Sequence, residues 1–150
     1  MKQTFSAETL KSYALTFKAI DRENRGFIDT DQLMEALYLT GVKSDRKTVI
    51  GIIQLLEEGT ENTMDLGEFV HFMHVCANAR TDDILSVIFY SADFDYTGTI
   101  NKKKLRKIVG KLGIKMNEDE LGNVYQSTAD NKDGTISQGM FKALMAELMQ

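Results

Sequence analysis

Apolar residues recur along this 150-residue chain with a period of 36. One set of equivalent positions holds Ile28, Met64, Ile100 and Ile136. The set five residues later holds Leu33, Phe69, Leu105 and Phe141. A third set holds Phe17, Ile53, Phe89 and Tyr125. A fourth holds Leu37, Met73, Val109 and Met145. Since these sets stay in register through four units, the chain is predicted to contain four copies of one supersecondary unit.

Each unit is predicted to form a helix, a loop and a second helix. Apolar residues on either side of the loops follow helical spacing, as in Tyr13, Phe17 and Ile20. Ser6 is placed to begin the first helix, and Gly41 to end the second in a left-handed conformation. The fold class is therefore all-α.

The four units are expected to dock in pairs, because a lone helix pair cannot bury its own apolar face. This predicts an N-terminal lobe over residues 1–76 and a C-terminal lobe over residues 84–150, joined by the polar linker 77–83. Within each lobe the two loops are expected to make a short strand contact, Ile28 with Met64 and Ile100 with Ile136.

The polar residues of the third loop have the spacing of a calcium site. Oxygen-bearing residues stand at every second position from Asp93 to Asn101, and Gly98 provides the sharp turn. A 12-residue EF-hand loop binds calcium through positions 1, 3, 5, 7 and 9 and a bidentate glutamate at position 12. Position 12 here is Lys104. The loop thus combines the spacing of a calcium site with a cation at a ligand position.

With four loops beginning at residues 21, 57, 93 and 129, the whole chain resembles the calmodulin and troponin-C superfamily, which includes the myosin light chains. The resemblance implies four EF-hand units in two lobes, each lobe with an apolar cleft that grips an amphipathic helix. The light chains within this family combine degenerate loops with binding to IQ-type helices.

Loops three and one are the candidate metal sites, and neither has the complete ligand set. In loop one, Arg25 replaces the oxygen ligand at position 5 and Gln32 replaces the glutamate. We expect calcium binding there to be weak, with magnesium as another possible ion because it retains more of its own waters. The candidate ligands are Asp93, Asp95, Thr97, Thr99 and Asn101 in loop three, and Asp21, Glu23 and Asp29 in loop one.

For Lys104 and Arg25, the basic residues at ligand positions of these two loops, two placements of the side chain are possible. Lys104 either reaches back as a tethered cation that pairs with Asp93 or Asp95, or lies along the exposed helix face. Arg25 either points outward or pairs with Asp21 and Glu23.

Loops two and four are further from the calcium pattern. Loop two keeps Glu68 at position 12, but Gly59 supplies no ligand at position 3. Loop four has Ala129 and Met140 at its two ends. Loop four is not expected to bind calcium, and loop two only weakly.

Because the loops are incomplete, the helices are expected to carry the function. The favoured hypothesis is a light-chain-like adaptor that binds an IQ-type helix of a larger cytoskeletal protein, largely without calcium. The alternative is a calcium sensor with one or two atypical low-affinity sites. Flexible apolar side chains suit adaptable grooves. The predicted target-binding residues are Phe72, Met73, Leu144, Met145 and Met149.

Composition and charge limit the kinds of binding partner that are expected. The net charge is only −4. A basic stripe formed by Lys103, Lys107, Lys111 and Lys115 is either a solvated face or a contact for an acidic protein partner or anionic lipid. Nucleic acid is not expected, because no aromatic residues interleave with this stripe. No apolar run is long enough to span a membrane. The single cysteine, Cys76, fits a reducing compartment, so the expected location is the cytoplasm, with cytoskeletal association for the light-chain-like role.

Catalysis is not expected, because no constellation of nucleophile, base and acid is recognisable. His71 and His74 lack the neighbouring ligands of a zinc site and are interpreted as helix-surface or core-edge residues.

Overall fold

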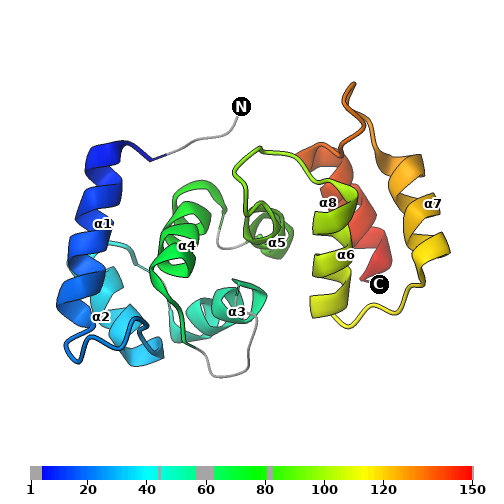
Figure 1. Cartoon of the computed structure of the whole chain (residues 1–150). Coiled ribbons are helices and arrows are strands. Elements are labelled where there is room, and N and C mark those ends of the chain that lie inside the picture. The colour runs from blue at the N-terminus through cyan, green and yellow to red at the C-terminus, as the bar shows by residue number, and fades with distance from the viewer. Residues whose placement is uncertain (1–4, 44, 57–62, 81–82, 150) are drawn as a thin grey trace.

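The computed structural model describes residues 5–43, 45–56, 63–80 and 83–149. These ranges contain eight helices (Figure 1), and their only β-type pairings are isolated bridges, so the all-α prediction is confirmed. The helices are α1 (Ala7–Ile20), α2 (Thr30–Thr40), α3 (Arg46–Leu56), α4 (Leu66–Asn78), α5 (Ile84–Ala92), α6 (Lys102–Lys111), α7 (Glu118–Thr128) and α8 (Gln138–Leu148). None of the helices in the described ranges has both the length and the apolar character needed to cross a bilayer.

The helix ends follow local capping chemistry. The Ser6 hydroxyl accepts a hydrogen bond from the Thr9 amide at 3.1 Å, as the predicted start of α1 requires. Gly41 ends α2 with φ 78°, a left-handed conformation that glycine adopts without strain. Helices α2, α4 and α7 each begin with a reciprocal capping box, formed by Asp29 with Gln32, Asp65 with Glu68 and Asn117 with Glu120.

Loops are joined in pairs by the predicted strand contacts. Ile28 and Met64 exchange two backbone hydrogen bonds of 2.9 Å, and Ile100 and Ile136 exchange bonds of 3.0 and 2.8 Å. All four side chains are fully buried or nearly so. The 36-residue repeat therefore brings equivalent residues of neighbouring units face to face.

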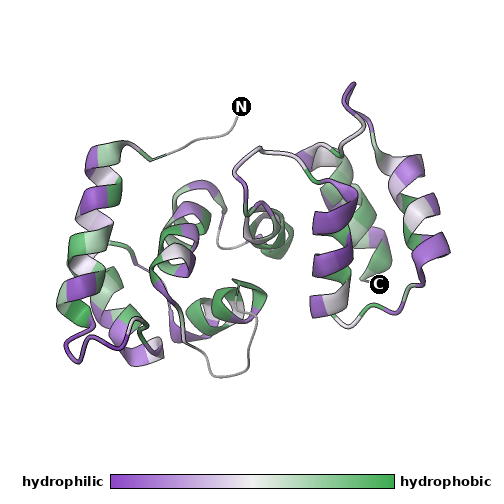
Figure 2. Ribbon diagram, in the orientation of Figure 1, coloured by the Kyte–Doolittle hydropathy of each residue, from purple (hydrophilic) through white to green (hydrophobic). Residues whose placement is uncertain are grey.

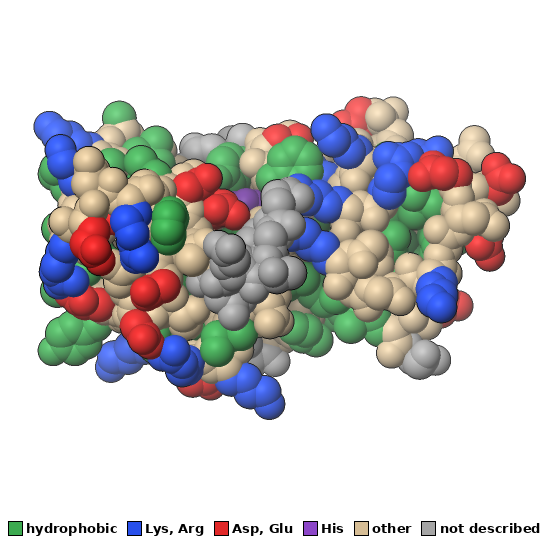
Figure 3. Space-filling view, turned by 60° about the horizontal axis from the view of Figure 1, so that its bottom comes forward, with side chains coloured by type: hydrophobic (Ala, Val, Ile, Leu, Met, Phe, Trp, Pro, Cys, Tyr) green, Lys and Arg blue, Asp and Glu red, His purple; other side chains and the backbone are tan. Residues whose placement is uncertain are grey.

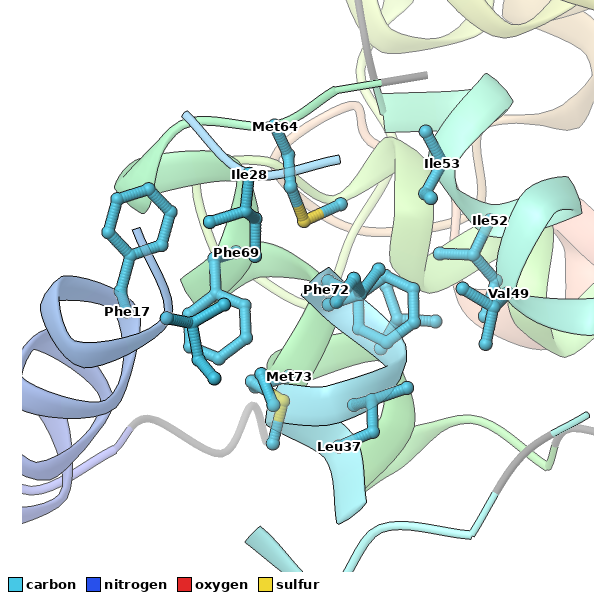
Figure 4. Close-up of a cluster of buried hydrophobic side chains, with 14 of the residues drawn as sticks. Phe17, Ile28, Leu37, Val49, Ile52, Ile53, Met64, Phe69, Phe72 and Met73 are labelled. Atoms are coloured by element: carbon cyan, nitrogen blue, oxygen red, sulfur yellow. The ribbon is translucent and has the colours of Figure 1, made fainter. Parts of the chain in front are cut away.

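Two hydrophobic clusters form the core, one dominated by α1–α4 and one by α5–α8. Figure 4 shows the first cluster, where Phe69 and Phe72 of α4 lie among side chains from the other helices of that half. Apolar residues face inward and polar residues outward on most helices (Figure 2). Helix α5 is different, because it is apolar on nearly all sides. Such a helix must be covered on more than one face.

Helix α5 contributes side chains to both clusters. Its Val87 belongs to the first cluster, while Ile88 and Phe89 belong to the second. It packs against α3 and α4 on one side and against α6 and α8 on the other (Figure 1). Within the predicted linker, α4 continues to Asn78 and Asp83 caps α5, while residues 81–82 lie outside the described ranges. The two halves are thus docked against each other.

Candidate functional site

Lys104 occupies the centre of loop three. Its side chain is only 1% exposed, although it carries a charge. The ammonium donates hydrogen bonds to Asp93 Oδ1 at 2.9 Å, Thr97 Oγ1 at 2.8 Å and the Thr99 carbonyl at 2.7 Å. It also lies 2.5 Å from Asp95 Oδ1. These oxygens stand at positions 1, 3, 5 and 7 of the loop, so the tethered-cation alternative is confirmed.

Local helix geometry directs this lysine inward. Position 12 of each loop is the third residue of the following helix, and its side chain points back towards the helix start. In loop two, Glu68 uses this geometry to accept a hydrogen bond from the Asp65 amide at 2.9 Å. In loop three, the Asn101 side chain accepts from the Lys104 amide at 2.8 Å, and the longer lysine stem reaches past it into the loop. Asn101 is therefore a helix cap.

Asp93 is the buried anion that the lysine neutralises. Its side chain is fully buried. Besides the ammonium, it accepts hydrogen bonds from the Thr97 amide at 3.0 Å and the Gly98 amide at 2.9 Å. A buried carboxylate is strongly unfavourable unless it is paired and hydrogen-bonded. The network meets both requirements without a metal ion.

Asp95 lies at the rim of the same network and is 43% exposed. Burial raises the pKa of Asp95, but the hydrogen bonds from Lys104 and Thr97 outweigh this effect, so its pKa lies below the ordinary value. Asp95 is thus held in the charged form that pairs with the ammonium.

Loop one has a different internal arrangement. Arg25 donates to Gln32 Oε1 at 2.8 Å, lies 4.0 Å from Asp29 Oδ2 and stacks over the Phe27 ring at 4.6 Å. Of the two alternatives for Arg25, the pairing with Asp21 and Glu23 is therefore wrong. The reason is local, because Gln32 at position 12 lies within reach and the guanidinium itself lies over the Phe27 ring, a cation–π contact.

The three candidate ligands of loop one have other roles. Asp21 accepts hydrogen bonds from the Arg25 and Gly26 amides at 2.9 and 2.8 Å. Asp29 caps α2, and Glu23 is exposed. Across the described ranges, no three His, Cys, Asp or Glu side chains converge on a point that could hold a metal ion. These donor sets do not fit calcium in this conformation. In loop three the Lys104 ammonium already contacts the oxygens of positions 1, 3, 5 and 7, and in loop one position 12 is Gln32, whose oxygen accepts from Arg25.

Loop four is held by hydrogen bonds of its own. Asp130 accepts from the Ser137 amide at 2.8 Å and from its hydroxyl at 2.7 Å. The Tyr125 hydroxyl donates to the Gly134 carbonyl. For loop two, positions 57–62, including Gly59, lie outside the described residues.

The predicted target-binding residues are mostly inside the protein. Phe72, Met73, Leu144 and Met145 are buried in the two clusters (Figure 4 for the first two), whereas Met149 is 44% exposed. The four buried side chains can contact a helix only after the surrounding helices separate. Their role in target binding stays a prediction.

The predicted basic stripe is divided between solvent and structure. Lys103 and Lys107 are exposed, and the Lys107 ammonium lies 5.5 Å from the centre of the Phe94 ring. Lys111 instead donates to the Leu55 carbonyl at 2.7 Å, so it joins α6 to the last turn of α3. Figure 3 shows several basic side chains near the middle of one face. A contact with an acidic partner there stays a prediction.

A cluster of aromatic and histidine rings between the halves of the molecule was not predicted from the sequence. His71 and His74 of α4 are buried, which excludes the helix-surface alternative for them and leaves the core-edge one. Tyr90 and Tyr96, from α5 and loop three, contact the His74 ring. The available signal was a tyrosine at loop position 4, where loop one has Asn24.

Comparisons with known proteins show low identity over the whole chain. No protein-family model matches. Putative calmodulin-like protein 6 of Oryza sativa subsp. japonica is 25% identical over 149 residues, which cover 97% of this chain and 88% of the relative. Calglandulin of Bothrops insularis is 23% identical over 147 residues, covering 97% and 94%.

Two other matches carry less weight, one because it covers a small part of the relative and one because the structural likeness is weak. Calcium-dependent protein kinase 21 of Oryza sativa subsp. japonica is 25% identical over 138 residues, which cover 92% of this chain but only 24% of the kinase. Among solved structures, a chain of the TREX2 CID domain complex from Chaetomium aligns over 95% of this chain and 91% of that chain, at 16% identity and a TM-score of 0.42. That likeness is too weak to bear on function.

Proposed function

Given that this chain belongs to the calmodulin and EF-hand superfamily, we propose that it is a calmodulin-like adaptor that binds its target largely without calcium. The target is an amphipathic, IQ-type helix of a larger cytoskeletal protein. The observation that carries the proposal is the Lys104 ammonium, which contacts four oxygens of loop three where an ion would lie.

The Lys104 ammonium makes the conformation of loop three independent of the free calcium concentration. A calcium sensor works because the ion prefers one conformation and shifts the population towards it. In loop three, calcium would have to displace Lys104 and would still lack the two carboxylate oxygens of position 12. Since affinity depends on ligand number and charge, this exchange is unfavourable. The loop keeps one conformation at rest and during a calcium signal.

Target binding is expected to use the apolar residues of the two clusters. A helical target provides anchors at about i, i+3, i+4 and i+7, which fit a groove between separated helices. Met149 is accessible at the end of α8, whereas Leu144 and Met145 on the same helix become accessible when α8 moves. The energy for opening therefore has to come from the target helix, since no ion supplies it.

The first experiment is a calorimetric titration of the metal-free protein with calcium at physiological magnesium, with an apolar dye monitored in parallel. The wild-type protein should show neither micromolar binding nor a dye response. Lys104→Glu should gain one calcium site, because it restores the glutamate of position 12. Lys103→Glu is the matched control, since it makes the same charge change on an exposed neighbour and should gain none.

Two outcomes would contradict this account. If Lys104→Glu binds no calcium, the lysine is not what prevents binding in loop three. If the wild-type protein binds calcium at micromolar concentrations and the dye signal rises, the protein is a calcium sensor with atypical sites.

The adaptor function is tested by titrating IQ-type peptides in the presence of a calcium chelator. Met149→Ala should weaken binding several-fold. Met140→Ala, on the same helix and similarly exposed, should not. Absence of peptide binding without calcium would remove the adaptor hypothesis.

A further inference from the structure

Tyr96 adopts a backbone conformation that tyrosine normally avoids. It stands at position 4 of loop three with φ 57°, in the left-handed region. The equivalent residue of loop one is Asn24, with φ 53°. Asparagine tolerates this region, whereas a bulky side chain there is a genuine outlier. Strain of this kind persists only where surrounding contacts compensate for it.

The compensating contacts lie on the other half of the molecule. The Tyr96 ring centre is 4.6 Å from that of His74 and 5.6 Å from that of His71, in edge-to-face geometry. Both histidines belong to α4 and are buried. His71 Nε2 also lies 2.9 Å from the Tyr90 carbonyl, which can only accept, so the ring donates to the last turn of α5. Loop three and α5 thus meet the same face of α4.

Lys104 fixes the segment that carries Tyr96. The two neighbours of Tyr96 in the sequence, Asp95 and Thr97, both contact the ammonium, at 2.5 and 2.8 Å. Without the lysine, the carboxylates of Asp93 and Asp95 would lie close together with no cation between them, and like charges in one site repel each other. The position of the tyrosine ring therefore depends on the ammonium.

We propose that loop three is a latch between the lobes: Lys104 holds the loop, and Tyr96 holds the loop against His71 and His74 of α4. The sequence feature that replaces the ion thus also sets the docking of one lobe on the other. This inference goes beyond the proposed adaptor function and does not depend on which helix the protein binds.

The test is a distance measurement between the lobes in the full chain. Spin labels at Lys18→Cys in α1 and Lys132→Cys in loop four occupy exposed positions of the two halves. Cys76 is poorly reactive, since burial raises the pKa of its thiol to about 12. Electron–electron double resonance should give one narrow distance distribution for the parent protein.

Tyr96→Asn is the decisive variant, because asparagine suits the backbone conformation but lacks the ring. It should broaden the distribution and lower the ratio of docked to undocked molecules by roughly tenfold, the effect of losing two ring contacts. Tyr96→Phe keeps the ring and should remain docked. Tyr38→Asn removes a highly exposed tyrosine and is the matched control. Circular dichroism checks that helix content is retained.

Lys104→Met tests the link to the lysine and should broaden the distribution as Tyr96→Asn does. A narrow distribution in Tyr96→Asn would overturn the latch. Broadening in Tyr96→Asn but not in Lys104→Met would overturn the role of the lysine. Neither result affects the peptide titrations that test the adaptor function.

Discussion

Replacing Lys104 by methionine removes the charge but nearly preserves the length of the side chain. In the structure, this change deletes an ammonium that donates to Asp93, Thr97 and the Thr99 carbonyl. Asp93 would remain fully buried, with hydrogen bonds from the Thr97 and Gly98 amides and from the Thr97 hydroxyl. The variant therefore isolates the contribution of the buried cation.

The expected loss of stability follows from burial. Removing one partner of a buried ion pair typically costs about 3–5 kcal/mol, because the other charge is left uncompensated. Asp93 keeps two amide donors, and the more exposed Asp95 contributes little, so we expect a value of about 3 kcal/mol. Urea unfolding at pH 7 measures this difference. Lys103→Met, on the exposed side of α6, should change the free energy of unfolding by less than about 0.5 kcal/mol.

The pH dependence provides an independent check. The pKa of Asp95 is lowered in the folded state. Stabilisation of this type is present above the unfolded-state pKa and is lost as the pH falls through the folded-state pKa. The part of the stability difference between the wild-type protein and Lys104→Met that comes from Asp95 should therefore be lost below about pH 4. A Lys104→Met protein as stable as Lys103→Met would refute the role of the buried ion pair, and a difference that persists unchanged in acid would refute the contribution of Asp95.

Two further predictions concern titratable side chains of α4. Cys76 should react with thiol reagents much more slowly than a free cysteine at pH 8, because burial raises its pKa to about 12; rapid labelling of the folded protein would contradict this. Burial also lowers the pKa of His71, against the opposing effects of the Tyr90 carbonyl and Asp93. Since the unfolded chain then binds the proton more readily, the free energy of unfolding should decrease between pH 7.5 and 5.5, and His71→Asn should reduce this decrease. Urea unfolding of the wild-type protein and His71→Asn at the two pH values measures the change in the free energy of unfolding. An equal change in the two proteins would exclude His71 as the cause.

The sequence determined the repeating architecture, because its signals act within a few residues. Helical spacing, the caps at Ser6 and Asp29 and the turn at Gly98 depend on local backbone geometry, and each predicts its own segment. The same local reasoning identified the missing glutamate at position 12 of loop three and limited Lys104 to two alternatives. It failed for Arg25, whose partners depend on side-chain packing within loop one.

Only the tertiary structure decided between the alternatives for Lys104, because the outcome depends on where α6 enters relative to Asp93, eleven residues earlier. Tertiary packing also decided that α5 serves both clusters and that Tyr96 reaches His74 on the other half of the molecule. These contacts join segments that lie far apart in the chain, and periodicity says which face of a helix is apolar but not what covers it. For this protein, the sequence defined four loops with incomplete ligand sets. Packing of α6 against loop three then placed Lys104 among the loop oxygens, and packing between the two halves placed Tyr96 against His74.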